Sequence, residues 1–429
     1  MNQMNYFPVT WRHPDDADLF WSQDRLHYPD PVTPLEFSFI EGAVDAGLGK
    51  ALRHYDIPLS LLNRHINGYA YFCVLPDALA DDAAATLAAQ SALKLGVAMD
   101  NLLQLWQSQW LPEIQQHLVF WEQYSLSTAA LPDLLQHINA TEARMKRVWE
   151  IHFLLFLPSM LAISRFADLY AELLKPTDAF APYQLLTGFD TKTMQSAEAL
   201  WRLSRQILAS PLLLHNFSQN PAEQVLSRLA ELPTAATFLA ELQSYLRVHG
   251  YRADKLSLTS PFWVEDATPV IKSLQAYIQQ PERDWLDRQQ MIAQREEAVA
   301  DFYQQLARYP LSVQAEATRL LQAAQSGAFL KEEHGYWLDY QSNYWVRQVL
   351  LAIGQRLTTV QLLAKSEDVF YLQLNEVKTL LAGATVSLPA LQALIAERQN
   401  LAARFADCTP PAVLGTIPAD PPPDDLIAR

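Results

Sequence analysis

Helical blocks bounded by prolines fill most of this sequence, from about Asp81 to Cys408. Proline lacks the backbone N–H that a helix interior needs and fixes φ, so it starts or ends helices. Glycine supplies only 12 of the 429 residues, whereas Leu, Ala and Gln recur throughout. This mixture favours helices over sheets, and we predict an all-α fold of long helices. The boundaries between blocks fall at Leu111-Pro112, Leu131-Pro132, Lys175-Pro176 and Gln280-Pro281.

The two ends of the chain lack this helical pattern. Residues 1–80 hold closely spaced aromatics and prolines, so we predict an irregular or short-stranded segment packed on the helical body. Residues 409–429 hold six prolines and no helical periodicity, which predicts an extended linker. The chain therefore divides into an N-terminal segment (1–80), a helical domain (81–408) and a proline-rich linker (409–429).

Apolar spacing predicts individual helices within the helical domain. We expect further long helices at about Arg283 to Ala307 and Leu388 to Ala406. The apolar stretch from Phe153 to Ile163 is too short to span a bilayer, and we expect Pro158 to break it. The clearest stripe, at helical spacing, predicts a core helix and consists of Val346, Val349, Leu350, Ile353, Leu357 and Val360.

The charge balance excludes two classes of partner. With 32 basic and 47 acidic side chains, the net charge is −15, which repels nucleic-acid phosphates and anionic lipid surfaces. We therefore expect neither nucleic acid nor membrane as a partner. Cys73 and Cys408 are far apart, and the N-terminus lacks a secretory signal, so we expect a cytoplasmic protein.

The standard catalytic motifs are missing from the sequence. The glycine-rich stretch from Gly42 to Lys50 lacks the first glycine of a phosphate-binding loop, and Ala51 replaces its Ser or Thr. No GxGxxG, GxSxG or HExxH motif is present. The ten histidines are scattered and show no helical metal-pair spacing, so we predict no metal or cofactor in this chain. A metal site assembled across helices stays open as an alternative that no motif supports.

Two clusters of polar and aromatic residues are candidate sites. The first contains His249, Gly250 and Arg252 and continues into residues 260–266. It suits a helix C-terminus, with Gly250 ending the helix and the cations near its carbonyls, or a binding site.

The second cluster runs from Lys331 to Asp339 and on to residue 347. In an α-helix one face would carry a polar stripe, and His334 would point away from it. Such stripes are usually solvated, but if this one lines a cavity, Arg347 could hold an oxyanion or phosphoryl group. The neighbouring aromatics suit a pocket for a flat organic ligand or ordinary core packing. The stripe consists of Glu332, Tyr336, Asp339, Asn343 and Arg347.

Several local motifs, in order along the chain, resemble the central region of phosphoenolpyruvate synthase-like phosphotransferases. This group includes rifampicin phosphotransferase and phenylphosphate synthase. The motifs are Trp21 to Phe39, Asn67-Gly68-Tyr69 with Tyr71, Trp149 with His152, Leu186 to Asp190 with Trp201, the two clusters above, Gly354 to Leu357 and Glu367 to Leu372.

The resemblance implies a helical domain that binds a phosphate acceptor. In that family an ATP-grasp domain and a swivelling phosphohistidine domain supply the phosphoryl group, so ATP and Mg²⁺ are expected on partner domains or subunits. No ATP-grasp segment precedes Met1 and no phosphohistidine motif is found, so we expect no activity from the chain alone. The acceptor is expected to be a hydrophobic or aromatic hydroxylated small molecule.

Roles for individual residues follow from these two clusters. We expect Glu333, His334 or Asp339 to accept or position the hydroxyl proton. The expected substrate-binding residues, with Arg252 and Arg347 as anion clamps, are His249, Arg252, Tyr336, Asn343 and Arg347. The alternative is a non-catalytic ligand-binding or regulatory scaffold that keeps the family fold.

Overall fold

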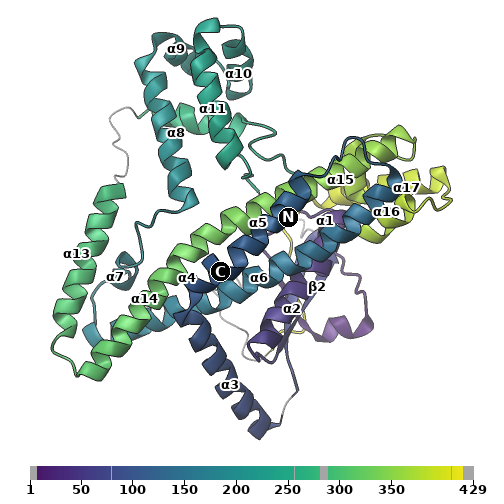
Figure 1. The fold of residues 1–429 in the computed structure, drawn as a ribbon. Helices are drawn as coiled ribbons and strands as arrows, with labels where there is room; N and C mark the ends of the chain where they lie inside the picture. The colour runs from purple at the N-terminus through teal and green to yellow at the C-terminus, as the bar shows by residue number, and fades with distance from the viewer. Residues whose placement is uncertain (1–6, 79, 256, 281–287, 407, 419–429) are drawn as a thin grey trace, which may run out of the picture.

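Helix α6 (Leu131–Leu174) is the axis of the helical body, and α2, α3, α14, α15 and α16 pack against it. The computed structural model describes residues 7–78, 80–255, 257–280, 288–406 and 408–418. Helices dominate and a small sheet lies near the N-terminus, so the predicted fold class is confirmed (Figure 1). Helix α14 (Leu311–His334) makes the most extensive contact with α6.

The remaining helices follow in chain order. Three π-helical turns interrupt them, at Ile40–Val44, Trp106–Trp110 and Gly335–Tyr340. The α-helices are α1 (Pro34–Phe39), α2 (Asp45–His54), α3 (Asp81–Asp100), α4 (Leu102–Leu105), α5 (Leu111–Glu122), α7 (Ala181–Gln184), α8 (Lys192–Ala209), α9 (Pro211–Gln219), α10 (Ala222–Ala230), α11 (Ala236–His249), α12 (Thr268–Ile278), α13 (Arg288–Leu306), α15 (Gln341–Thr359), α16 (Leu374–Leu381) and α17 (Leu388–Phe405).

Helix α6 runs unbroken through Pro158, so the predicted break is wrong. A proline inside a helix leaves the carbonyl four residues earlier without its usual N–H partner. Here the hydroxyl of Tyr55 donates to the carbonyl of Leu154 at 2.6 Å and takes the place of that N–H. The helix therefore continues through Pro158, because the side chain of Tyr55, at the end of α2, supplies the missing hydrogen bond.

By length and composition alone, α6 is also apolar enough to cross a membrane. In the structure many of its apolar side chains, such as Leu155 and Phe166, lie fully buried in the cores that α6 shares with α14 and α15. It therefore acts as a core helix in this fold.

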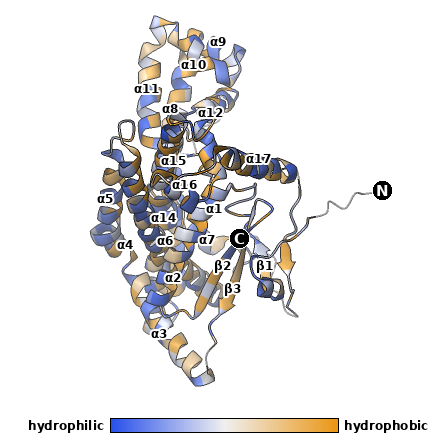
Figure 2. Cartoon of the chain, turned by 90° about the vertical axis from the view of Figure 1, so that its right-hand side faces the viewer, coloured by the Kyte–Doolittle hydropathy of each residue, from blue (hydrophilic) through white to orange (hydrophobic). Residues whose placement is uncertain are grey.

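The four strands form one antiparallel sheet in the order β2-β3-β1-β4. β1 (Phe20–Gln23), β2 (Leu59–Ile66) and β3 (Tyr69–Pro76) come from the segment predicted to be short-stranded, and β2 packs on α2 (Figure 2). β4 (Val413–Gly415) lies in the predicted linker and pairs with β1, so this part of the tail belongs to the sheet. Residues 419–429 of that linker lie outside the described residues.

The predicted C-terminal helices agree with the structure. Five residues of the predicted apolar stripe are completely buried in α15, whereas Val360 follows the helix and is 45% exposed. Helix α17 matches the predicted range to within one residue, and α13 covers the described part of the range predicted to begin at Arg283.

Helices α8 to α12 form a bundle with its own hydrophobic core (Figure 1, Figure 2). It stands away from the main body, and residues 250–266, between α11 and α12, lead back to the body. The bundle and the body meet where α8 begins and α14 ends, because the backbone N–H of Lys192 donates to Glu333 at 3.0 Å. This junction positions the candidate site.

Two glycines let helices approach α6 at van der Waals contact. A Cβ at Gly47 of α2 would lie 2.6 Å from the backbone at Trp149 and Glu150, and one at Gly327 of α14 would lie 2.8 Å from the carbonyl oxygen of Ser159. These two close contacts bracket His152 on α6 and so fix the spacing of the helices around it.

Candidate functional site

A π-helical turn at Gly335–Tyr340 brings His334 and Asp339 together. A π turn closes hydrogen bonds between residues five apart, so residues five apart lie on one side of it. The expectation that His334 points away from Asp339 assumed a regular α-helix and is wrong. One ring nitrogen each from His334 and His152 and one carboxylate oxygen of Asp339 all lie within 4.8 Å of one another.

His152 enters this cluster from α6. Its Nδ1 lies 3.1 Å from Oδ1 of Asp339, and the two side chains are 14% and 23% exposed, so solvent reaches both. The ring stacks on Phe156 and contacts Trp149, and its centroid lies 4.8 Å from that of His334. We call His152, His334 and Asp339 the imidazole–carboxylate cluster.

The surroundings fix the proton positions in this cluster. Burial opposes ionisation of Asp339, but its hydrogen bond and electrostatic interaction with His152, with further help from His334 and His27, hold the pKa of Asp339 below its usual range. An ionised Asp339 accepts the Nδ1 proton of His152, so the neutral imidazole has its lone pair on Nε2. No described residue forms a hydrogen bond with that Nε2.

His334 is neutral and only 4% exposed. Burial lowers its pKa to about 4, and the neighbouring His152 acts in the same direction. Its Nδ1 lies 2.7 Å from the carbonyl oxygen of Leu330, which can only accept, so Nδ1 carries the proton. The Nε2 of His334 is buried and has no hydrogen-bond partner among the described residues.

The loop after β1 brings further titratable groups near the cluster. His27 pairs with Asp24 at 2.9 Å, and this hydrogen bond, together with the charges of Asp24 and Asp339, raises the pKa of His27 although burial opposes the change. Burial and the nearby carboxylates also raise the pKa of Tyr28. The loop belongs to the stretch Trp21 to Phe39, whose motif the sequence analysis noted.

Arg252 lies near the start of α8 and has one donor without a partner among the described residues. Its guanidinium stacks on Tyr340 at 5.3 Å and donates Nη2 to Oγ1 of Thr193 at 3.1 Å. Its Nε is buried without a partner among the described residues. His249 is also buried, and burial together with the charges of Arg252 and Lys192 lowers the pKa of His249 to about 4. Gly250 ends α11, as predicted.

Arg347 has protein partners for the donors described. Nε donates to Glu265 at 3.0 Å, and Nη1 donates to the carbonyl oxygens of Leu258 and Thr259. Glu36 holds the same loop from α1, accepting from the backbone N–H of Leu258 at 2.7 Å. The structure thus places Arg347 in a tether of the loop 257–266, whereas we expected an anion clamp.

The other predicted residues lie around the same junction. Glu333 accepts from Trp337 and from the backbone of Lys192, at the start of α8. Tyr336 donates its hydroxyl to the carbonyl of Val248 at 2.7 Å. Asn343 lines a small cavity that also contains Glu36. Glu333 and Tyr336 thus join the bundle to the body.

A cavity of about 820 Å³ lies along α6 and α14, and the residues that line it do not include the three cluster residues. Lys331 and Glu332 at its rim lie within one helical turn of His334, and Met160 lies eight residues, or about 12 Å, beyond His152 on α6. Its volume is within the usual range for small-molecule sites. Its apolar lining consists of Met160, Leu161, Ile163, Ala167, Leu186, Phe189, Met194, Met291 and Ala328.

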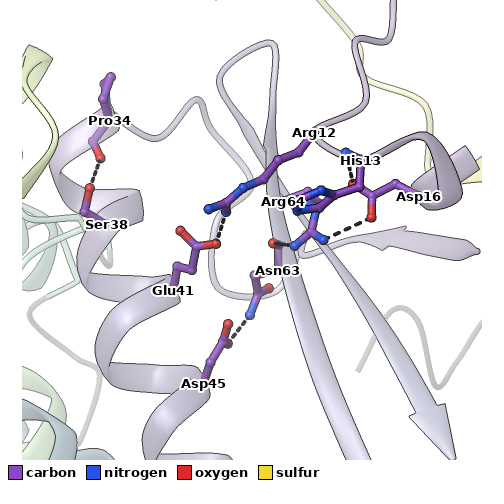
Figure 3. Close-up of polar contacts among 9 residues, drawn as sticks. All are labelled: Arg12, His13, Asp16, Pro34, Ser38, Glu41, Asp45, Asn63 and Arg64. Atoms are coloured by element: carbon purple, nitrogen blue, oxygen red, sulfur yellow. Dashed lines mark hydrogen bonds and ion pairs between the residues drawn. The ribbon is translucent and has the colours of Figure 1, made fainter.

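A second cavity of about 560 Å³ lies between the N-terminal segment, the sheet and α16. Figure 3 shows polar contacts around it, where Arg64, which lines the cavity, donates to both oxygens of Asp16 at 2.8 and 3.0 Å. Arg12 pairs with Glu41, and Asn63 donates to Asp45, whose pKa burial raises to about 7. Because these groups satisfy one another, we interpret them as structural.

Comparisons with known proteins identify relatives along the whole chain. Residues 152–332 match the family model described as the rifampicin phosphotransferase fourth domain. Chondramide synthase cmdD of Chondromyces crocatus is 35% identical over 418 residues, which cover 96% of this chain and 11% of that protein. The uncharacterized phosphotransferase YvkC of Bacillus subtilis is 23% identical over 407 residues, covering 94% of this chain and 47% of its own length. The chain thus spans less than half of either relative, and the predicted resemblance is confirmed.

Sequence reasoning did not select His152 or the cavity as parts of a site. His152 appeared only as half of a motif with Trp149. A detectable signal was its position in a leucine-rich helix, one turn before Phe156. The cavity walls come from five helices, so no local pattern marks them.

Proposed function

We propose that this chain, whose residues 152–332 match the rifampicin phosphotransferase fourth domain, binds the molecule that accepts the phosphoryl group. The single observation that carries this proposal is the 820 Å³ cavity along α6 and α14, the two helices that carry His152 and His334. The matched model covers residues 152–332, and this range contains His152 and much of the cavity lining. The family match and the geometry thus support the same location.

The cavity suggests the kind of acceptor. Its lining is rich in apolar side chains, and three methionines can adapt to irregular shapes because their side chains are unbranched and flexible. An acceptor that fills the cavity and also reaches His152 spans about two turns of α6. We therefore propose a large, mostly hydrophobic molecule whose hydroxyl group lies at the end nearest the cluster.

His152 is the proposed acceptor of the hydroxyl proton. The Asp339 carboxylate holds Nδ1–H, so Nε2 offers its lone pair to a hydroxyl in the solvent-accessible part of the cluster. The hydroxyl oxygen attacks phosphorus, its proton passes to Nε2, and the bond from phosphorus to the donor breaks. Asp339 therefore keeps its predicted role in positioning the proton.

Arg252 is the proposed anion clamp. Phosphoryl transfer spreads negative charge over the transferred oxygens, and cationic side chains stabilise that charge. Arg252 has a donor without a partner among the described residues, and its guanidinium stacks on Tyr340, the residue that follows Asp339 in the sequence. Arg347 is left out of this role because Glu265 and two carbonyls already hold it.

ATP, Mg²⁺ and the phosphohistidine are proposed to come from an ATP-grasp unit and a histidine-bearing unit, as further domains or as separate subunits. The chain itself contributes the acceptor site, and we place this assembly in the cytoplasm. The net charge of −15 disfavours nucleic acid and anionic membranes as partners.

The test is a transfer assay with the chain's natural partners. The chain is isolated from its source cells together with the proteins that bind it, and it is incubated with ATP and the hydrophobic extract of those cells. Mass spectrometry then identifies molecules that gain a phosphoryl group. We expect hydroxylated hydrophobic products with the assembly and none with the chain alone.

Two variants separate binding from chemistry. His152→Gln is expected to reduce turnover about 10²- to 10⁴-fold while acceptor binding persists. Ala328→Trp fills the cavity and is expected to abolish binding and turnover together. The control is His137→Gln, a buried histidine far along α6. Full turnover by the His152 and Ala328 variants would overturn the proposal.

A further inference from the structure

The geometry points to a divalent transition-metal site formed by His152, His334 and Asp339. Two imidazoles and one carboxylate are the donor set that proteins use for zinc, iron(II) and manganese(II) with positions left open. The ligand atoms of the three side chains already lie within 4.8 Å of one another. Among the described residues, no other group of three or more histidine, cysteine or acidic side chains has ligand atoms this close together.

The buried Nε2 of His334 is an independent indication of a ligand. His334 is 4% exposed, and its Nε2 has no hydrogen-bond partner among the described residues. Burying a polar atom without a partner is costly, so such an atom calls for an explanation. A cation that binds this lone pair supplies the missing partner.

The second hydrogen bond of His334 matches that of a metal ligand. Metal-bound histidines usually donate their other ring N–H to a carboxylate or a backbone carbonyl, which fixes the tautomer and the ring orientation. The Nδ1 of His334 makes such a bond to the carbonyl of Leu330, at 2.7 Å. The ring is therefore held with its free lone pair on Nε2.

The distances in the cluster need little adjustment. Zinc binds nitrogen and oxygen at about 2.0–2.2 Å, so two ligands of a tetrahedral ion lie about 3.3 Å apart. Nδ1 of His152 and Oδ1 of Asp339 are 3.1 Å apart. The ligand nitrogen of His334 lies at most 4.8 Å from the other two ligand atoms, and rotation of the side chains can shorten this distance. The ion then has three protein ligands and one open position.

Binding of the cation and the proton transfer proposed above use the same atoms. An ion between Nδ1 of His152 and Asp339 displaces the proton that they share, and His152 then carries its proton on Nε2. In that state His152 cannot accept a proton from the acceptor. The cation site is nevertheless tested without acceptor or phosphoryl donor, so its failure leaves the proposed function standing.

The test is isothermal titration of the metal-free chain with Zn²⁺, followed by Mg²⁺ as a hard cation of similar charge. We expect one Zn²⁺ per chain and no Mg²⁺ binding at the same concentrations, because Mg²⁺ prefers oxygen ligands. Cobalt(II) provides a second readout, since its visible absorption reports the coordination geometry. Absence of Zn²⁺ binding, or equal binding of Mg²⁺, would overturn the proposal.

Matched variants assign the ion to these side chains. His334→Gln and Asp339→Asn are each expected to weaken Zn²⁺ binding at least about tenfold. The control His137→Gln removes a histidine that is equally buried and also has an unpartnered Nε2, but lies outside the cluster. Circular dichroism checks folding, and Asp339→Asn, at a partly exposed position, provides the test if the His334 variant unfolds. Unchanged Zn²⁺ affinity in the folded variants would contradict the assignment.

Discussion

Pro158 and Tyr55 together decide whether α6 continues unbroken near the cluster. Pro158 removes one hydrogen bond from the helix, and Tyr55 supplies a replacement donor to the carbonyl of Leu154. The contact is buried, so loss of the hydroxyl leaves a carbonyl without a partner. His152 lies only two residues before Leu154, and this repair therefore supports the candidate site directly.

Removing the Tyr55 hydroxyl is expected to destabilise the fold. Tyr55→Phe should lower the free energy of unfolding by about 1–3 kcal/mol, the cost of a buried polar group that loses its partner. In a Pro158→Ala background the restored N–H can bond to Leu154, and the same substitution should cost less. Denaturant titration of the four proteins measures this coupling. Equal costs in the two backgrounds would show that Tyr55 does not compensate for Pro158.

Glu36 makes stability depend on pH. Burial raises its pKa to about 7, although the hydrogen bonds from Leu258 and Ser257 and the charge of Arg347 oppose the change. The folded carboxyl binds its proton more tightly than the unfolded one, so its contribution to stability is complete below pH 4.5 and is lost as the pH rises to about 7. Ionisation thus destabilises the fold because it puts a charge in a buried site, although the hydrogen bonds from Leu258 and Ser257 favour the ionised form.

The variant Glu36→Gln tests this pH dependence. Relative to this variant, the wild-type chain should lose up to roughly 3 kcal/mol of unfolding free energy between pH 4.5 and pH 7.5. Chemical denaturation at a series of pH values measures the difference. An exposed control, Glu297→Gln, should follow the wild type. If the curves of wild type and Glu36→Gln run parallel, Glu36 does not titrate in this range.

At the scale of elements, the spacing of α6 and α14 sets the geometry of the cluster. Gly327 allows the backbone of α14 to meet Ser159 on α6, and the π turn Gly335–Tyr340 then rotates Asp339 toward His152. Both features are needed, because His334 and Asp339 belong to the α14 side and His152 belongs to α6.

A methyl group at Gly327 is expected to force these helices apart. Gly327→Ala places a carbon 2.8 Å from the Ser159 oxygen and should cost about 1–3 kcal/mol, as overpacking usually does. The matched control is Gly96→Ala in α3, where no atom lies within 4 Å and the better helix propensity of alanine should stabilise by about 1 kcal/mol. Thermal unfolding compares the two. A neutral or stabilising Gly327→Ala would contradict the close packing.

At the scale of the whole molecule, the sheet joins the two ends of the described chain. β4 pairs with β1, and the hydroxyl of Tyr69 donates to the carbonyls of Phe405 and Cys408. The loop that follows β1 carries His27 and Tyr28 toward the cluster. The sheet, the body and the α8–α12 bundle thus contribute to one site, and none of them contains it alone.

Much of the helical architecture could be predicted from the sequence because apolar spacing and proline positions are local signals. The stripe of α15 and the range of α17 illustrate this. The continuity of α6 could not be predicted, since it depends on Tyr55, about a hundred residues away. The orientation of His334 also required the structure, because the choice between an α and a π turn depends on tertiary contacts.

The site shows the same division between local and long-range information. Asp339, His334 and Arg252 could be selected from their local clusters. His152 comes from another helix, and the partners of Arg347 lie more than eighty residues away. Local patterns identify chemically capable residues, whereas only the packing decides which of them remain free to bind a ligand.

The most direct test of the central claim is a crystal structure of the chain with a hydroxylated compound captured from the hydrophobic extract of its source cells. The account predicts that the compound fills the cavity between α6 and α14. Its hydroxyl oxygen should lie within hydrogen-bonding distance of Nε2 of His152. A compound bound elsewhere, with this cavity empty, would contradict the account.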